Sequence, residues 1–297
     1  MLDATTPCRF LNLRSILVVG LLLLPGIVAA QAPPPMPPEK VVSVYGQGIH
    51  YYEAGQGPAV ILLHGLGGDG TRWAANLGPL SQQFHVYALD EIGFGNSDKP
   101  LIEYQIETFS DFLRGFMEAL SIPKATLVGN SLGGWIALDL AIRQPRLVER
   151  LVLVDAGGLS PERGAPRAAV DLNPATLAGT RRLLEVLFYD PQRVTDAAVR
   201  QTFERRLKSG NGYTIQRLQA GTRAGGQWVD EHLGTIQVPT LVLWGREDRL
   251  IPVSVGERFQ KAIPGARLVV IPECGHLPQV EKPREFNAAL LAFLTQP

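Results

Sequence analysis

The chain has 297 residues, of which 45% are hydrophobic and 19% are charged. Such a composition is typical of a soluble globular protein with a sizeable core, and the length suits one large α/β domain as well as two small ones. The 28 basic and 28 acidic residues give a formal net charge of zero, so no overall field favours nucleic acid, and we predict a mixed, solvated surface.

The first thirty residues have the layout of a secretory signal peptide. Two arginines precede an apolar run over 16–30, which ends in the small residues that signal peptidase requires. A membrane-spanning helix needs about 20 apolar residues, so this run is short for one. We predict a signal peptide over 1–30 and export to the periplasm or the medium, with no membrane span in the mature protein. A retained N-terminal membrane anchor is the alternative. The proline-rich residues 31–40 predict an extended linker.

Eight segments have the character of β-strands. Two short ones flank a turn, and six are continuous apolar runs of the kind that strands buried on both faces require. The expected strands cover 41–44, 50–53, 59–63, 84–89, 125–128, 151–154, 240–244 and 267–271. Helical spacing of apolar residues follows at 109–120 and 132–142. Strands alternating with helices predict an α/β fold with a mostly parallel, twisted sheet and helices on both faces.

The alternation stops between 158 and 238. This stretch is rich in Arg, Ala and Leu and predicts several helices without strands, with 181–189, 194–207 and 213–221 as candidates. An insertion late in such a sheet lies over the carboxyl ends of the strands, where ligands bind. We therefore predict a helical lid over 158–238 on a core formed by 41–157 and 239–297. A packing subdomain without substrate contact is the alternative.

The strongest functional pattern is Gly129-Asn130-Ser131-Leu132-Gly133, a G-x-S-x-G sequence between a predicted strand and a predicted helix. The turn between these elements must be sharp, and a glycine two places either side of the serine removes a side chain that would clash. Ser131 is then held in a strained conformation with its hydroxyl exposed. We predict that Ser131 is a nucleophile. A serine that only caps the helix is the alternative.

A serine hydroxyl is a weak nucleophile and needs a base. Of the five histidines, His276 follows the last predicted strand, at the sheet edge where Ser131 would emerge, so we predict it as the general base. Asp248 lies in a tight loop after the strand over 240–244 and is the predicted acid that orients the imidazole. Asp155, at the end of another strand, is the rival acid.

A glycine-rich loop with the sequence HGLGG covers 64–68, directly after a predicted strand. Glycines let the backbone bend so that an N–H group faces the reacting carbonyl. We predict that the backbone N–H groups of Leu66 and Leu132 stabilise the oxyanion, with Gly67 as an alternative donor. His64 is predicted to hold this loop in place.

Together these residues make the chain similar to the α/β-hydrolase superfamily, from the first predicted strand to the last helix. The chain order of Ser131, Asp248 and His276 matches that superfamily, and the segment 90–100 matches its D-x-x-G-x-G-x-S loop. Within the superfamily the chain resembles lidded esterases, lipases and meta-cleavage-product hydrolases. A serine in the nucleophile position argues against dehalogenases and epoxide hydrolases, which carry an aspartate there.

Two details favour ester cleavage over carbon–carbon bond hydrolysis. The carbon–carbon hydrolases often have H-G-x-G-x-G in the oxyanion loop and a Trp after the catalytic His, whereas this chain has HGLGGDG and Leu277. The predicted export also favours ester cleavage, because the degradation of aromatic rings is generally cytoplasmic. Asn130, next to the predicted nucleophile, resembles the carbon–carbon hydrolases instead.

We therefore predict a carboxylic ester hydrolase that acts on a small-molecule ester through an acyl-enzyme, without a metal or organic cofactor. Carbon–carbon bond hydrolysis, lactone opening or peracid formation on the same triad is the alternative, and a non-enzymatic binding scaffold is a third possibility. Cys8 would leave with the signal peptide, so Cys274 would be the only thiol and no internal disulfide is expected. No pair of Cys or His residues has the spacing of zinc ligands.

Overall fold

The computed structural model of the chain describes residues 36–161, 170–225 and 227–296. The predicted signal peptide over 1–30 lies outside the described residues, and so does the first half of the predicted linker over 31–40. No helix in the described part of the chain is long and apolar enough to cross a membrane.

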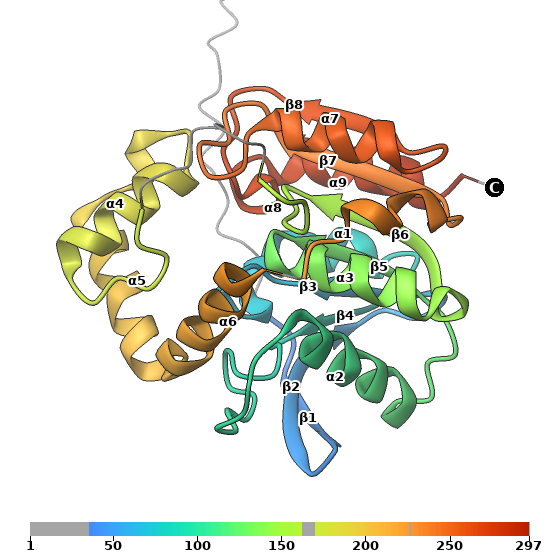
Figure 1. The fold of residues 1–297 in the computed structure, drawn as a ribbon, viewed down its shortest axis with the longest axis horizontal. Helices are drawn as coiled ribbons and strands as arrows, with labels where there is room; N and C mark the ends of the chain where they lie inside the picture. The colour runs from blue at the N-terminus through green and yellow to red at the C-terminus, as the bar shows by residue number, and fades with distance from the viewer. Residues whose placement is uncertain (1–35, 162–169, 226, 297) are drawn as a thin grey trace, which may run out of the picture. The chain divides into compact units, whose positions relative to one another are not determined.

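An eight-stranded sheet forms the centre of the described structure, in the spatial order β1-β2-β4-β3-β5-β6-β7-β8 (Figure 1). The strand β2 pairs antiparallel with β1 and β4, and the other neighbouring pairs are parallel. The sheet is therefore mostly parallel, as the sequence predicts. The strands are β1 (Glu39–Val44), β2 (Gln47–Ala54), β3 (Ala59–Leu63), β4 (His85–Leu89), β5 (Ala125–Asn130), β6 (Val148–Val154), β7 (Thr240–Gly245) and β8 (Arg267–Ile271).

The central strands are mostly apolar, and helices cover both of their faces. Every residue of β5 and of β7 is buried, which is the condition that their continuous apolar sequences predict. The strand β3 lies between β4 and β5, and its last residue, Leu63, pairs with Gly129 near the end of β5. Since the strands from β3 to β8 are parallel, their carboxyl ends reach the same edge of the sheet.

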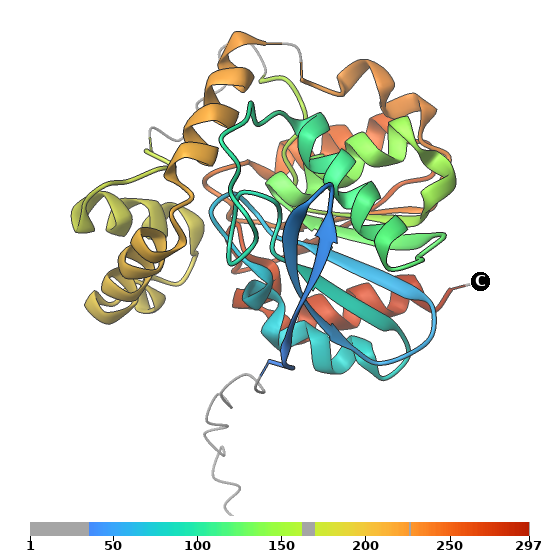
Figure 2. The same cartoon turned by 90° about the horizontal axis from the view of Figure 1, so that it is seen from below.

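Two layers of helices sandwich the sheet. The helices α2, α3 and α7 cover one face, and α1 and α9 cover the other (Figures 1 and 2). Phe109 and Phe116 of α2 are fully buried in one apolar core, and Phe286 and Leu290 of α9 are fully buried in the other. Each such side chain contributes about 1.5–3 kcal/mol when removed from water. These helices are α1 (Ala74–Ser81), α2 (Ile106–Ala119), α3 (Leu132–Arg143), α7 (Val253–Ala262), the short α8 (Pro278–Glu281) and α9 (Pro283–Leu294).

The described residues between 158 and 238 contain helices and no strand, as predicted. Three α-helices lie together at one end of the sheet (Figure 1): α4 (Leu177–Leu187), α5 (Asp196–Ser209) and α6 (Gly212–Ala224). The helix α4 begins earlier than predicted because the side chain of Thr176 accepts a hydrogen bond from Gly179 N–H and caps it. Short 3₁₀ turns complete the described structure: η1 (Gly70–Trp73), η2 (Pro145–Leu147), η3 (Pro191–Arg193) and η4 (Asp230–Thr235).

Candidate active site

Ser131 occupies a strained turn between β5 and α3. Its φ and ψ are 54° and −113°, a conformation that non-glycine residues rarely adopt. The turn is so tight that a Cβ atom on Gly129 would lie 2.2 Å from the carbonyl oxygen of Gly133, and one on Gly133 would lie 2.3 Å from the carbonyl oxygen of Leu63. Only glycine fits at either position, for the steric reason that the sequence pattern suggested.

His276 and Asp248 are brought together from the loops after β8 and β7. The Nδ1 atom of His276 lies 2.7 Å from Oδ2 of Asp248, and both side chains are buried. The other oxygen of Asp248 accepts hydrogen bonds from the N–H groups of Leu250 at 2.7 Å and Ile251 at 3.0 Å. These bonds fix the carboxylate so that His276 Nδ1 donates to it. The Nε2 atom, which remains as the acceptor, is buried and has no hydrogen-bond partner in the described structure.

Ser131 and His276 open onto one cavity of about 1000 Å³, and Asp248 lies behind His276. The structure therefore joins two of the three predicted residues by a hydrogen bond and places the third in the same cavity. Ser131 makes no hydrogen bond to His276 in this state. Hydrogen bonds between nucleophile and base are commonly longer without substrate and tighten in the reacting complex.

The glycine-rich loop lies directly against the nucleophile. Gly68 N–H donates to the carbonyl oxygen of Gly65 at 2.9 Å, and Gly67 has a φ of 71°, so residues 65–68 form a turn that requires glycine at its third position. A Cβ atom on Gly65 would lie 3.2 Å from the Cβ atom of Ser131. This close approach brings the loop to the position where an oxyanion would form.

Leu66 and Leu132 both line the cavity. Leu132 is the first residue of α3, so its N–H group has no partner within the helix. Across the described ranges, neither amide donates a hydrogen bond to another residue. Both N–H groups are thus available to an oxyanion, which is the condition that the predicted oxyanion hole requires.

His64 holds the loop from behind. It is fully buried, its Nδ1 lies 2.8 Å from the carbonyl oxygen of Gly65, and its Nε2 accepts a hydrogen bond from Glu91 N–H at 3.0 Å. Burial lowers the pKa of His64, and the neutral ring is the form that accepts at one nitrogen and donates at the other. These contacts match the structural role that the sequence predicts for His64.

Asp155, the rival acid, does not contact His276 through a hydrogen bond. Its Oδ1 instead accepts from Gly245 N–H at 2.9 Å. Within the described residues, Asp155, Asp248 and His276 are the one group whose ligand atoms, all within 4.8 Å of one another, could hold a metal ion. The 2.7 Å separation of His276 and Asp248 is that of a hydrogen bond, so a proton fits the space between their atoms.

The cavity wall contains a tryptophan that the sequence analysis did not place there. Trp135 lines the cavity and stacks on Trp228 with ring centroids 4.8 Å apart. Trp135 follows Ser131 by four positions, so the two residues lie on one face at the start of α3. That spacing is the signal that could have identified it. Trp244, in contrast, is fully buried in the core.

Arg72 is a second cavity residue that the sequence analysis missed. Its side chain lines the same cavity as Ser131. Burial lowers the pKa of the Arg72 guanidinium, while the charge of Asp69 opposes this effect. No hydrogen bond joins its guanidinium to another residue in the described parts of the chain. Arg72 therefore offers N–H donors to a ligand, although the negative charge of Asp69 offsets part of its positive charge.

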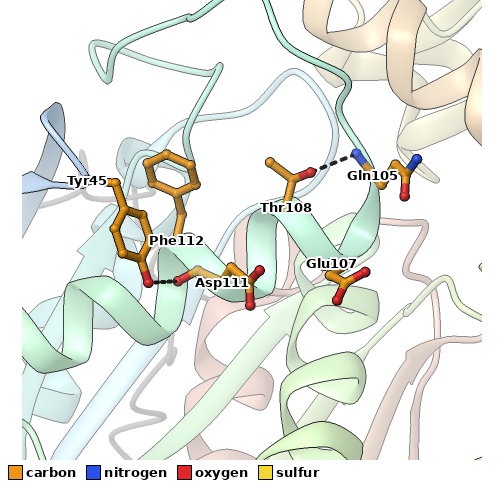
Figure 3. Close-up of a pocket in the computed structure, with 6 residues that line it drawn as sticks. All are labelled: Tyr45, Gln105, Glu107, Thr108, Asp111 and Phe112. Carbon is orange, nitrogen blue, oxygen red and sulfur yellow. Dashed lines mark hydrogen bonds between the residues drawn. The ribbon is translucent and has the colours of Figure 1, made fainter.

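A smaller surface hollow of about 360 Å³ lies between the β1–β2 turn and α2 (Figure 3). Tyr45 and Phe112 pack edge-on at its base, and the hydroxyl of Tyr45 donates to the carbonyl oxygen of Asp111. Its two carboxylates, Glu107 and Asp111, are already paired with Arg143. None of the predicted catalytic residues lines this hollow, so the chemistry belongs to the larger cavity.

The similarity of the chain to known proteins agrees with this geometry. A family model described as the alpha/beta hydrolase fold matches residues 58–283. The 2-hydroxy-6-oxo-6-phenylhexa-2,4-dienoate hydrolase of Comamonas testosteroni is 34% identical over 261 residues, which cover 84% of this chain and 91% of that protein.

Solved structures show the same likeness. A meta-cleavage product hydrolase from Pseudomonas fluorescens IP01 matches with a TM-score of 0.76 and 30% identity, covering 86% of this chain and 97% of that chain. A bacterial membrane phospholipase A matches with a TM-score of 0.77 and 30% identity, covering 86% and 85%. On the strength of the fold, the nucleophile turn and these matches, the chain belongs to the α/β-hydrolase family.

Proposed function

We propose that the chain is a serine hydrolase whose nucleophile is Ser131. In this mechanism His276 takes the proton of the serine hydroxyl as Ser131 attacks a substrate carbonyl. Asp248 holds the imidazole and stabilises its positive form. The N–H groups of Leu66 and Leu132 receive the negative charge that develops on the carbonyl oxygen. The bond between the carbonyl carbon and the leaving group then breaks, and His276 gives its proton to the leaving group. A water molecule activated by the neutral His276 next attacks the acyl-enzyme, and the acid is released as Ser131 regains its proton.

The substrate class that the comparisons support best is a 2-hydroxy-6-oxo-dienoate, so the proposed reaction is carbon–carbon bond hydrolysis. The relative from Comamonas testosteroni is named for such a substrate. That compound contains a ketone and a carboxylate but no ester or amide, so its hydrolysis must break a carbon–carbon bond beside the ketone. The 34% identity over 84% of the chain is the observation that carries this proposal, and it favours the alternative raised by the sequence over ester cleavage.

The cavity suits such a substrate in shape and charge. Leu183 and Leu187 of the insertion and the stacked Trp135 supply apolar wall, which matches an apolar or aromatic 6-substituent. Arg72 supplies a guanidinium in the same cavity that makes no hydrogen bond among the described residues, and guanidinium groups bind carboxylates in two-pronged hydrogen bonds. The insertion thus serves as one wall of the site, which supports its predicted role as a lid.

Ester hydrolysis is the second candidate, and two observations favour it. Leu277 follows His276 where the carbon–carbon hydrolases often have a tryptophan. The phospholipase A match, at 30% identity, is as similar to this chain as the meta-cleavage product hydrolase structure. The same triad and oxyanion hole serve both reactions, so the substrate and not the catalytic geometry distinguishes them.

A substrate panel separates the two candidates. We expect the purified protein to hydrolyse 2-hydroxy-6-oxo-6-phenylhexa-2,4-dienoate with a kcat/KM more than about tenfold above that for p-nitrophenyl acetate and p-nitrophenyl octanoate. The reverse order would assign the site to esters. No turnover of any of the three would contradict the proposed function itself.

Replacing Arg72 by methionine is expected to weaken binding of the dienoate. Because the guanidinium would pair with the substrate carboxylate, Arg72→Met should raise KM about tenfold for the dienoate and leave kcat within about threefold. The neutral p-nitrophenyl acetate, which has no carboxylate, should show unchanged KM. Arg200→Met, at an exposed position of α5, is the matched control. An equal loss with both substrates would show that Arg72 supports the fold and not the anion.

A further inference from the structure

A second buried carboxyl lies beside the proposed catalytic acid. Asp155 follows β6 and is fully buried, and its Oδ1 accepts a hydrogen bond from Gly245 N–H. Its other oxygen, Oδ2, is buried without a hydrogen-bond partner among the described residues. Oxygens of Asp155 and Asp248 and a ring nitrogen of His276 lie within 4.8 Å of one another. The proposed mechanism leaves this carboxyl unused.

Two carboxylates so close together cannot both stay ionised away from water. Of the two, Asp248 is the carboxyl that stays ionised, because it accepts hydrogen bonds from two backbone N–H groups and faces His276 Nδ1. Among the described residues, Asp155 accepts from a single N–H group. The shared proton therefore belongs on Asp155, where Oδ2 is the oxygen free to carry it.

The groups around Asp155 also favour its neutral form. Burial raises the pKa of Asp155 well above its usual range, and the negative charges of Asp248 and then Glu281 raise it further, while the hydrogen bond from Gly245 opposes them. The thiol of Cys274 is the other titratable neighbour, and burial raises its pKa as well, so it stays neutral.

We propose that Asp155 is a positioning residue that keeps its carboxyl neutral and donates the proton on Oδ2 in a hydrogen bond to the carboxylate of Asp248. The inference rests on the proposed function, in which Asp248 orients His276. The donated bond fixes the second side of the Asp248 carboxylate and withdraws part of its negative charge. It thereby limits how strongly Asp248 stabilises the protonated imidazole. The proton stays on Asp155 throughout the reaction.

The backbone at Asp155 decides which substitutions test the proposal cleanly. Its φ is 43°, in the left-handed region, and its N–H donates to the carbonyl oxygen of Leu243 at 3.1 Å. Asparagine tolerates this conformation better than most residues, and glycine adopts it freely. Asp155→Asn keeps one acceptor and supplies a neutral donor, whereas Asp155→Gly removes the donor without backbone strain.

The two variants should differ in the pH dependence of kcat/KM. Asp155→Asn should keep kcat within about threefold of the wild type and leave the acid limb of the profile in place, because a neutral donor still faces Asp248. In Asp155→Gly, Asp248 loses a donor and holds the imidazolium more firmly. The firmer hold should move the acid limb to higher pH by roughly half to one unit. Because the second side of the Asp248 carboxylate is no longer fixed, His276 is oriented less well, and kcat should fall about tenfold with little change in KM. Asp196→Asn, at a fully exposed position, is the matched control and should behave as the wild type.

Several results would overturn the proposal. If Asp155 is ionised in the native enzyme, Asp155→Asn removes a negative charge and moves the acid limb to lower pH. An unchanged profile in a folded Asp155→Gly protein, or a misfolded Asp155→Asn protein, contradicts it as well. Loss of activity on EDTA treatment that a divalent cation restores would assign the space between these oxygens to a metal ion.

Infrared spectroscopy tests the inference without any turnover. Burial raises the pKa of Glu91 to about 8, so this carboxyl also absorbs as a neutral acid at neutral pH and the test needs a difference spectrum. The spectrum of the wild type minus that of Asp155→Asn should show the carbonyl stretch of a second neutral, buried carboxylic acid. Absence of this difference band refutes the inference even if the hydrolase activity is present. Presence of the difference band in a protein that hydrolyses no panel substrate would uphold the neutral carboxyl of Asp155 while the proposed function fails.

Discussion

Replacing Ser131 by alanine is expected to lower kcat by about 10⁶ for whichever panel substrate the wild type turns over. The hydroxyl at the strained turn, on the wall of the cavity, is the one group in the proposed mechanism that forms a covalent bond to the acyl carbon, and the hydrogen that replaces it in alanine cannot do so. The backbone N–H groups of Leu66 and Leu132 remain, so substrate binding should be largely kept. Steady-state kinetics supply kcat, and binding of substrate to the inactive variant supplies the affinity.

Labelling with a fluorophosphonate probe provides a second readout for Ser131. The wild type should react at this residue, and Ser131→Ala should not react at all. Ser81→Ala, in α1 on the opposite face of the sheet from α3, is the matched control and should label and turn over as the wild type does. A labelled Ser131→Ala protein would show that another hydroxyl is the nucleophile.

The fold was predictable wherever one strand carries one continuous apolar sequence. β3 and β8 have the predicted bounds because the apolar runs end at prolines or polar residues: Pro58 precedes β3, His64 follows it, and Pro272 follows β8. The strand β6 begins at Val148, before the predicted start at 151. The prediction started late because the polar residues Glu149 and Arg150, at the edge of the buried region, interrupt the apolar run. Pairing with β5, a tertiary contact, extends the strand through them.

The site was predictable where chemistry and chain order act together, and not where a side chain only lines a cavity. Ser131, His276 and Asp248 each follow a strand, so the parallel sheet brings them to one edge. Trp135 and Arg72 do not directly follow a strand, and an arginine or tryptophan in a helix or turn is ordinarily interpreted as a surface or core residue until the structure shows the cavity that it lines. The predicted signal peptide and export stay predictions, since they concern residues outside the described ranges.

Asp248→Asn should lower kcat by about 10⁴, for a reason that the hydrogen bonds around the residue make specific. One oxygen of Asp248 accepts from the N–H groups of Leu250 and Ile251, and the other accepts from His276 Nδ1. In the variant, the amide oxygen must stay with the two N–H groups, so the amide nitrogen faces His276 and donates to Nδ1. The imidazole is then forced to carry its proton on Nε2, where it cannot accept the proton of Ser131.

The tautomer of His276 distinguishes the effect of this variant from a general loss of structure. The melting temperature of Asp248→Asn should stay close to that of the wild type, and its KM should change little, because the side chain keeps its shape and its backbone contacts. Nitrogen NMR of labelled histidine should show the proton on Nδ1 in the wild type and on Nε2 in the variant. A loss of less than about 100-fold, or a proton that remains on Nδ1, would remove Asp248 from the proposed triad. The acid that orients the base would then have to be sought in Asp155, the other carboxyl within 4.8 Å of the ring.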